Sequence, residues 1–316
     1  MFLLRRCSNA PRRSNAPRRT ANDRTALRLA AALVMLTPLP AFAQWYFGSS
    51  TELRSNDNVT RSPVAENIEA DTVLLGSVEG GLHLQPGVYT GLTLSAGVTR
   101  EQFRRFAGLS QTRGLLGAAL DRKLGVGERA PRLRLGATIE RADFNSNTRN
   151  LWLHSVRLSY SQRLSDSLLL TAAITHENQQ GDNDRLRIAV PPARQLPGDT
   201  WNQEALVAST ALEWATGPAS WLTATLQFRH GETAASITPR PSILRQATAV
   251  TNDPLIGAGK VAYRLDANTR QFALDWNLAL TDAATAYFGA ERQLTRGGVS
   301  LSYQVDVIRA GIVFSY

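Results

Sequence analysis

The chain has 316 residues and a formal net charge of +9, with 43% hydrophobic residues, 19% charged residues and one cysteine, Cys7. This length is enough for one large domain, and one cysteine excludes an internal disulfide framework. Residues 1–43 hold eight arginines and one aspartate, so +7 of the +9 lies in that segment. The +2 that remains gives little support to nucleic-acid binding, and no nucleic-acid partner is expected.

Residues 1–43 have the three parts of a secretory signal peptide. The apolar run 26–40 follows an arginine-rich stretch and precedes Ala41-Phe42-Ala43, which fits a small-x-small cleavage site. The run is too short, and too interrupted by proline, to be a membrane-spanning helix. We therefore expect a cleaved leader over 1–43 and an exported mature chain that begins at Gln44.

From residue 44 onward, stretches of about 10–15 residues alternate between apolar and polar side chains, which is typical of half-buried strands. Within 88–99, for example, Leu92 and Leu94 fall on one face and Thr93 and Ser95 on the other. The predicted strands are 44–54, 70–85, 88–104, 111–125, 131–144, 150–164, 167–180, 201–215, 218–233, 267–281, 284–295 and 303–316.

The connections between these strands alternate in length. Short turns, such as Ser165-Asp166 and Asp282-Ala283, alternate with longer loops, such as 181–200. This pattern is that of outer-membrane barrels, whose short turns face the periplasm and whose longer loops face outward. The fold class that we predict is all-β: a transmembrane antiparallel up-and-down β-barrel of about twelve strands over 44–316, with both ends of the mature chain on the periplasmic side.

A soluble β-sandwich or lipocalin-like barrel is the alternative, because alternation alone does not tell which face is inside. Tryptophans near strand ends favour the membrane barrel, since aromatic residues gather at both membrane interfaces. One predicted girdle contains Trp45, Trp214 and Trp221, and the other contains Trp152 and Trp201.

Segment 234–266 leaves the strand number open. Val261, Tyr263 and Leu265 alternate, so 257–266 would extend a hairpin above the membrane. The segment would otherwise supply an additional strand pair, or a loop folded into the barrel mouth. Twelve strands is the prediction, with ten and fourteen as the alternatives.

The last strand resembles the closing strand of bacterial outer-membrane barrels, whose terminal aromatic residue and alternating apolar positions are read by the barrel assembly machinery. In this chain the positions are Ile308, Ala310, Ile312, Phe314 and Tyr316. They define the predicted lipid face.

Three further stretches resemble a broad group of proteobacterial β-barrels of the porin type. They are Thr51-Glu52-Leu53-Arg54-Ser55-Asn56-Asp57-Asn58-Val59-Thr60-Arg61, Phe103-Arg104-Arg105-Phe106-Ala107-Gly108-Leu109 and Tyr263-Arg264-Leu265-Asp266-Ala267-Asn268-Thr269. The resemblance runs through most of the mature chain and implies architecture. It brings no assigned substrate and transfers no functional residue.

The predicted lumen is the candidate site. Strand parity turns charged residues of both signs inward, and they either pair with one another or select a charged or zwitterionic solute. The candidate lumen residues are Arg113, Arg132, Arg134, Arg157, Arg163, Glu79, Glu140, Asp275, Glu291 and Arg309. The five arginines from 113 to 163 lie on three consecutive strands. By resemblance to general porins, such a wall facing acids implies a transverse field and a mild preference for anions.

Catalysis finds no support in these residues. The outer-membrane phospholipase resemblance requires a histidine and a serine two residues apart on one outward face. Here His176 has Asn178 in the place of the serine, and adjacent His154 and Ser155 point to opposite faces. We therefore expect no enzyme activity, no cofactor and no metal site.

The function predicted from the sequence is a passive porin-like channel for small polar or charged solutes in the outer membrane. The alternative is a structural, assembly or export-associated barrel whose lumen is plugged. The expected partners are outer-membrane lipid and lipopolysaccharide, the barrel assembly machinery and the small solutes.

Overall fold

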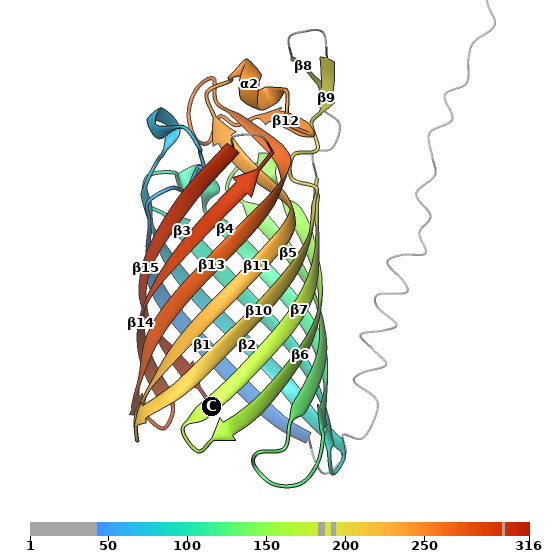
Figure 1. Ribbon diagram of the computed structural model, residues 1–316, viewed down its shortest axis with the longest axis vertical. Helices are drawn as coiled ribbons and strands as arrows, with labels where there is room; N and C mark the ends of the chain where they lie inside the picture. The colour runs from blue at the N-terminus through green and yellow to red at the C-terminus, as the bar shows by residue number, and fades with distance from the viewer. Residues whose placement is uncertain (1–42, 183–186, 191–193, 299–300) are drawn as a thin grey trace, which may run out of the picture. The chain divides into compact units, whose positions relative to one another are not determined.

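In the computed structural model, residues 43–182, 187–190, 194–298 and 301–316 are described, and they form a closed antiparallel barrel of 12 strands (Figure 1). The barrel strands are β1 (Ala43–Asn56), β2 (Asp71–Gly87), β3 (Thr90–Phe103), β4 (Gln111–Lys123), β5 (Arg132–Phe144), β6 (Leu151–Ser165), β7 (Leu168–Gly181), β10 (Gln203–Gly217), β11 (Ser220–Ile237), β13 (Val261–Thr281), β14 (Ala284–Gly297) and β15 (Leu301–Ser315). The predicted fold class and strand number are therefore confirmed. Residues 1–42, on which the predicted leader falls, lie outside the described part of the chain.

Each barrel strand pairs with its neighbours in chain order, and β1 closes the barrel by pairing with both β2 and β15. Five short turns join strand pairs at the end where β1 starts and β15 ends, which we call the turn end (Figure 1). The longest of them, 124–131, contains Gly125 and Gly127 with φ of 129° and 88°, a conformation that residues with a Cβ rarely adopt. The longer connections lie at the opposite end, the loop end.

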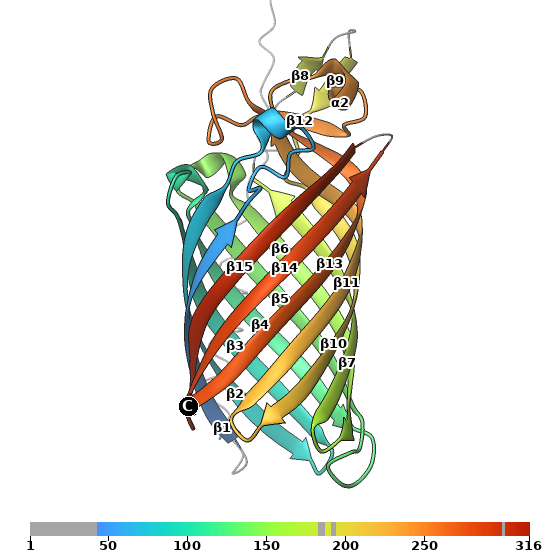
Figure 2. The same cartoon turned by 60° about the vertical axis from the view of Figure 1, so that its left-hand side comes forward.

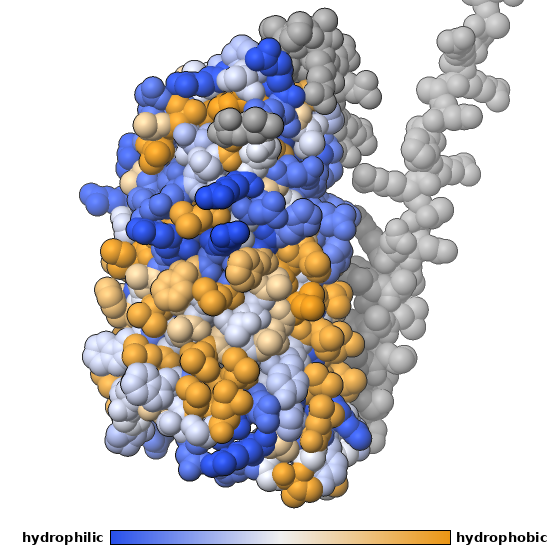
Figure 3. Space-filling view, in the orientation of Figure 1, coloured by the Kyte–Doolittle hydropathy of each residue, from blue (hydrophilic) through white to orange (hydrophobic). Residues whose placement is uncertain are grey.

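The outer wall carries the apolar half of each alternating strand. Leu74, Leu116, Ile174, Phe272 and Ile308 are all exposed on this side, as side chains facing lipid would be. On the face drawn in Figure 3, apolar side chains form a broad belt, with hydrophilic side chains gathered above it towards the loop end. Within the described residues no helix is long and apolar enough to span a membrane.

The packed core of the molecule lies above the barrel, at the loop end, and not inside the barrel. β11 and β13 pair beyond the other strands, from Thr233–Leu265 to Ile237–Val261. The connection between them, 238–260, contains α2 (Pro241–Leu244) and β12 (Ala249–Asn252), and we call it the cap loop. The buried residues of the cap loop pack with the tips of β11 and β13. Three almost completely buried residues of this cluster are Ile237 of β11, Val250 of the cap loop and Tyr263 of β13.

The cap loop crosses the mouth of the barrel. A Cβ added to Gly108, in the loop after β3, would meet Leu255 of the cap loop at 2.7 Å. Because β3 stands opposite β11 and β13 in the strand order, this contact bridges the mouth. Two of the three options for 234–266 are thus combined, since the segment both extends a hairpin and folds over the mouth, without adding a strand pair to the barrel (Figure 2).

Candidate functional site

Two charged walls face each other across the lumen. The five predicted arginines lie on β4, β5 and β6 at positions that alternate with exposed apolar residues such as Leu116, Leu135 and Val156, so they point inward. β14 is opposite β5 in the order of the strands, with β13, β15 and β1 beside it. These four strands carry the acidic wall.

The acidic wall is tightly paired. Arg309 Nη2 donates to Asp275 Oδ2 at 2.8 Å, and its Nη1 donates to Glu291 Oε2 at 3.3 Å. Beside them, Glu52 accepts from Tyr287 at 2.5 Å and from Arg54 Nε at 2.8 Å. Three carboxylates thus share two guanidiniums on this wall, so its fixed charge is negative.

The arginine wall is loosely paired by comparison. Arg113 lies 3.5 Å from Glu101, and Arg134 lies 3.6 Å from Asp121. Arg163 donates only to the carbonyl oxygen of Asp166, at 3.1 Å. Arg132 and Arg157 make no ion pair with any described residue.

These arginines are also in contact with water. The Arg134 side chain is 51% exposed although it points inward, and Arg132, Arg157 and Arg163 are exposed as well. Exposure on the inner face requires open space in the lumen beside β5 and β6. Glu79, the remaining predicted lumen acid, lies apart on β2, where it accepts from the Tyr46 hydroxyl at 3.2 Å.

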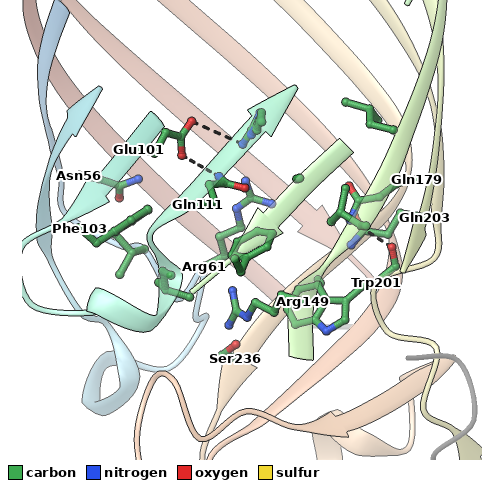
Figure 4. Close-up of a pocket in the computed structure, with 18 of the residues that line it drawn as sticks. Asn56, Arg61, Glu101, Phe103, Gln111, Arg149, Gln179, Trp201, Gln203 and Ser236 are labelled. Carbon is green, nitrogen blue, oxygen red and sulfur yellow. Dashed lines mark hydrogen bonds and ion pairs between the residues drawn. The ribbon is translucent and has the colours of Figure 1, made fainter. Parts of the chain in front are cut away.

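A cavity of about 320 Å³ lies at the loop end of the lumen, between the strands and the loops (Figure 4). Strands β1, β3 to β7, β10 and β11 line it, together with the loops after β1, β3, β5 and β7. The charged residues that line it are Arg54, Arg61, Arg113, Arg149, Glu101 and Glu140.

Arg61 reaches this cavity from the loop after β1, and a buried asparagine holds that loop. Asn58 is 1% exposed. Its amide nitrogen donates to the carbonyl oxygens of Ser62 and Gln304, at 3.2 and 3.0 Å. Its Oδ1 accepts from the Thr60 hydroxyl and the Ser62 N–H, at 2.9 and 3.0 Å. The turn closes with the Arg61 N–H donating to the Asn58 carbonyl at 3.1 Å.

Arg149 forms the opposite edge of the cavity. It lies in η3 (Asn147–Arg149), and its Nη2 donates to Asp253 of the cap loop at 2.5 Å. Its guanidinium lies over the Trp201 ring, 4.4 Å from the centroid. Burial is the main influence on the pKa of Arg149 and lowers it, Asp253 acts in the opposite direction, and the nearby Arg61 lowers it further.

Four buried polar atoms on the cavity lining have no hydrogen-bond partner among the described residues. Three are donors, Nε of Arg113, Nε of Arg149 and Nε1 of Trp201. The fourth is an acceptor, Oε1 of Gln111, whose amide nitrogen donates to Glu101 at 2.7 Å. A buried polar atom without a hydrogen-bond partner destabilises the folded protein. These four atoms therefore favour a bound solute that completes their hydrogen bonds.

Most of the residues that line this cavity were not among those predicted from strand parity. Arg113 and Glu140 belong to both sets, whereas Arg61, Arg149 and Trp201 come from irregular loops. Trp201, predicted to lie in the interfacial girdle, instead lines the cavity beneath Arg149. The predicted strand began at Trp201, whereas β10 begins at Gln203, so strand parity does not fix the direction of this side chain.

The C-terminal positions face outward. Ile308, Ile312 and Phe314 are exposed on the outer wall, and the backbones of Tyr316 and Phe47 exchange two hydrogen bonds, at 3.1 and 2.9 Å. Ala310 pairs with Leu53 in the same register. These residues therefore occupy the seam where the barrel closes.

The histidines considered for catalysis have no nucleophile beside them in the part of the chain that is described. His176 lies 3.7 Å from Glu204, and the Ser155 hydroxyl is 2.7 Å from the Thr138 hydroxyl instead of a histidine. No group of three or more His, Cys, Asp or Glu among the described residues is placed to hold a metal ion.

Comparison with known proteins identifies solved structures with a similar fold. No protein-family model matches the sequence, and no curated protein matches it. Among solved structures, an outer membrane channel from Pseudomonas putida F1 is similar with a TM-score of 0.56 and 13% identity, covering 89% of this chain and 100% of that one. An anion-selective porin from Comamonas acidovorans gives 0.41 and 6%, covering 87% and 99%. The chain has the closed-barrel fold of outer-membrane channels and porins.

Proposed function

We propose that the chain is a passive outer-membrane channel for small polar or charged solutes, with a mild preference for anions. The observation that carries this proposal is the exposed arginine wall. Arg132, Arg134 and Arg157 point into the lumen and are in contact with water, so an aqueous path runs beside them. The outer membrane is the fitting location, because the outer face of the barrel is an apolar belt. Its lipid and lipopolysaccharide, together with the barrel assembly machinery, are the proposed partners.

The preference for anions follows from how the charges are paired. Guanidiniums without a carboxylate partner attract anions, whereas Asp275 and Glu291 already share Arg309 and offer less free charge to a cation. No catalytic step is part of the proposal. The rival is a structural or assembly barrel with a plugged lumen, and the cap loop across the mouth is the observation in its favour.

Planar-bilayer recordings test the proposal. The protein should give steady openings, and its reversal potential in a salt gradient should show anions passing more readily than cations. The double variant Arg132→Gln/Arg157→Gln should bring the permeability ratio towards one, because it removes two lumen cations that have no ion-pair partner among the described residues. The matched control is Arg122→Gln/Arg270→Gln, which removes two arginines of the outer face and should leave the ratio unchanged.

Two results would count against the channel. Silence of well-folded protein would favour the plugged barrel. Cation selectivity that persists unchanged in Arg132→Gln/Arg157→Gln would show that the arginine wall does not set the preference.

A further inference from the structure

Among the residues that the structure describes, the charges around the loop-end cavity leave one cation and one anion without an ion-pair partner. Three of its four arginines have carboxylate partners, Arg54 with Glu52 at 2.7 Å, Arg113 with Glu101 at 3.5 Å and Arg149 with Asp253 at 2.5 Å. Arg61 has none among the described residues, and its charged neighbours are the cations Arg149 and Arg229. An isolated guanidinium next to other cations favours a bound carboxylate.

Glu140 is the unpaired anion. It is half-buried on β5, and it makes neither an ion pair nor a hydrogen bond with a described residue. Arg113 is close enough to interact with it electrostatically, but Glu101 already binds Arg113. A half-buried carboxylate without a hydrogen-bond donor favours a bound ammonium group.

Three of the four unpartnered atoms fall into the same two groups, and the fourth, Nε of Arg113, is a donor on the strand side. Nε of Arg149 and Nε1 of Trp201 are donors on the loop side of the cavity, where Arg61 also enters (Figure 4). Oε1 of Gln111 is an acceptor on the strand side, and Gln111 is 4% exposed. The loop side of the cavity therefore offers donors to a carboxylate, and the strand side offers the acceptors Gln111 and Glu140 to an ammonium group, beside the Nε donor of Arg113.

The remaining lining limits the size and nature of the solute. Phe103, Phe144, Leu151 and Leu153 give the cavity an apolar surface between its polar groups. Its volume of about 320 Å³ is at the lower end of the range of roughly 300–1,000 Å³ for small-molecule sites. A small solute with an apolar side chain fits these dimensions.

The backbone at Arg61 supports a binding role for its side chain. Arg61 is the one non-glycine residue with positive φ, 53°, in the described chain. This left-handed conformation is energetically unfavourable for a residue that has a Cβ, and glycine adopts it more readily. Because the four hydrogen bonds of Asn58 hold the turn in this conformation, the strain serves to aim a guanidinium into the cavity.

We propose that the cavity binds a zwitterionic solute of the amino-acid type, with its carboxylate at Arg61, Arg149 and Trp201 and its ammonium group at Glu140 and Gln111. The proposal deepens the channel function and rests on it, since it names the class of solute that the mouth selects. Opposite charges on one small molecule would satisfy both unpaired residues at once.

Three probes that share the branched apolar side chain of leucine test this on the refolded, full barrel. L-Leucine carries both charges, 4-methylpentanoate carries only the carboxylate, and 3-methylbutylamine carries only the ammonium group. Calorimetry should show leucine binding at least about tenfold more tightly than either analogue, since each analogue leaves one charged residue unpaired. Equal binding of the three probes, or tightest binding of an analogue, would overturn the proposal.

Variants assign the two ends of the solute. Arg61→Gln should remove the advantage of leucine over the amine, and Glu140→Gln should remove its advantage over the acid. Arg61→Lys should restore part of the affinity, because it returns the charge without the planar fork. The control is Arg104→Gln, an exposed arginine near the rim that does not line the cavity, and leucine should bind it as tightly as the wild type. Unchanged leucine affinity in both Arg61→Gln and Glu140→Gln would overturn the assignment.

Failure of this inference is distinguishable from failure of the channel. Steady conductance without leucine binding would leave the channel standing and remove the zwitterion site. Leucine binding by protein that gives no conductance would keep the site and remove the channel.

Discussion

At the scale of single residues, Asn58 determines more of the site than any charged residue does. It is fully enclosed, and its side chain ties the loop after β1 both to itself and to β15 through the carbonyl of Gln304. An amide with both donor and acceptor atoms satisfied in this way fixes one loop conformation, because any other would leave buried polar atoms unpaired. Arg61 is aimed by that conformation.

Replacing Asn58 with alanine should release this loop without unfolding the barrel. Loss of the buried hydrogen bonds should cost the loop about 1–3 kcal/mol, so the Ser62 amide should exchange with solvent roughly tenfold to a hundredfold faster. Hydrogen exchange followed by mass spectrometry measures this, with Thr148→Ala in an exposed loop as the control. Unchanged protection of 58–62 in Asn58→Ala would show that the asparagine does not hold the loop.

At the scale of elements, the strands were predictable wherever one face meets lipid and the other meets water. The alternation in β5, with Leu135 and Ile139 outside and Arg134 and Glu140 inside, is a direct result of these two environments. The alternation of burial fails at the start of β13, where Val261, Ala262 and Tyr263 are all buried, because this hairpin extends beyond the barrel and shares a buried cluster with cap-loop residues such as Val250. The predicted strand was 267–281, with an extended hairpin over 257–266 as one of three options, and the observed strand begins at Val261.

The same reasoning explains which part of the site was found. Residues on strands, such as Arg113 and Glu140, have a direction fixed by parity. Arg61 and Arg149 lie in a turn and in η3, where direction depends on the partners Asn58 and Asp253 that only the folded loops bring together. The directions of these side chains therefore could not be predicted from the periodicity of the sequence.

Strand β15 closes the barrel, and its outward aromatic residue should matter for assembly. Phe314→Ala removes a large apolar group from the seam beside β1, where Phe314 pairs with Ser49. We expect a smaller fraction of folded barrel in the membrane, measured by heat-modifiable migration on a gel. Ser315→Ala, one position along and without a large apolar group, is the control. Equal folded fractions in the two variants would contradict the proposed role of the C-terminal positions as an assembly signal.

At the scale of the whole molecule, charged side chains line the inner wall of the barrel, and the packed apolar core lies above the barrel at the loop end. Ile237, Val250 and Tyr263 are almost completely buried, yet they belong to the tips of β11 and β13 and to the cap loop. Such a core lets the cap loop hold one conformation across an open mouth. The cap loop is joined to the loops after β1, β3 and β5 by Asn67, Gly108 and Arg149.

The pair between Arg149 and Asp253 is the contact of the cap loop whose loss should open the mouth. Asp253 is 2% exposed and also accepts from the Ser236 hydroxyl, so Asp253→Asn would leave Arg149 as a buried charge without its partner. Breaking a buried ion pair in this way costs about 3–5 kcal/mol. The cap loop should detach from η3, while the strands keep their pairing.

Two measurements follow the detachment. Single-channel conductance should rise in Asp253→Asn, and trypsin should cut the cap loop at Arg245 or Lys260 faster than in the wild type. Glu66→Gln is the matched control, because it breaks the exposed pair between Glu66 and Arg240, which also joins the cap loop to the loop after β1. An exposed pair contributes about 0–1 kcal/mol, so this variant should behave as the wild type. If Asp253→Asn keeps the conductance and the trypsin resistance of the wild type, the cap loop is held by its apolar core and not by the ion pair.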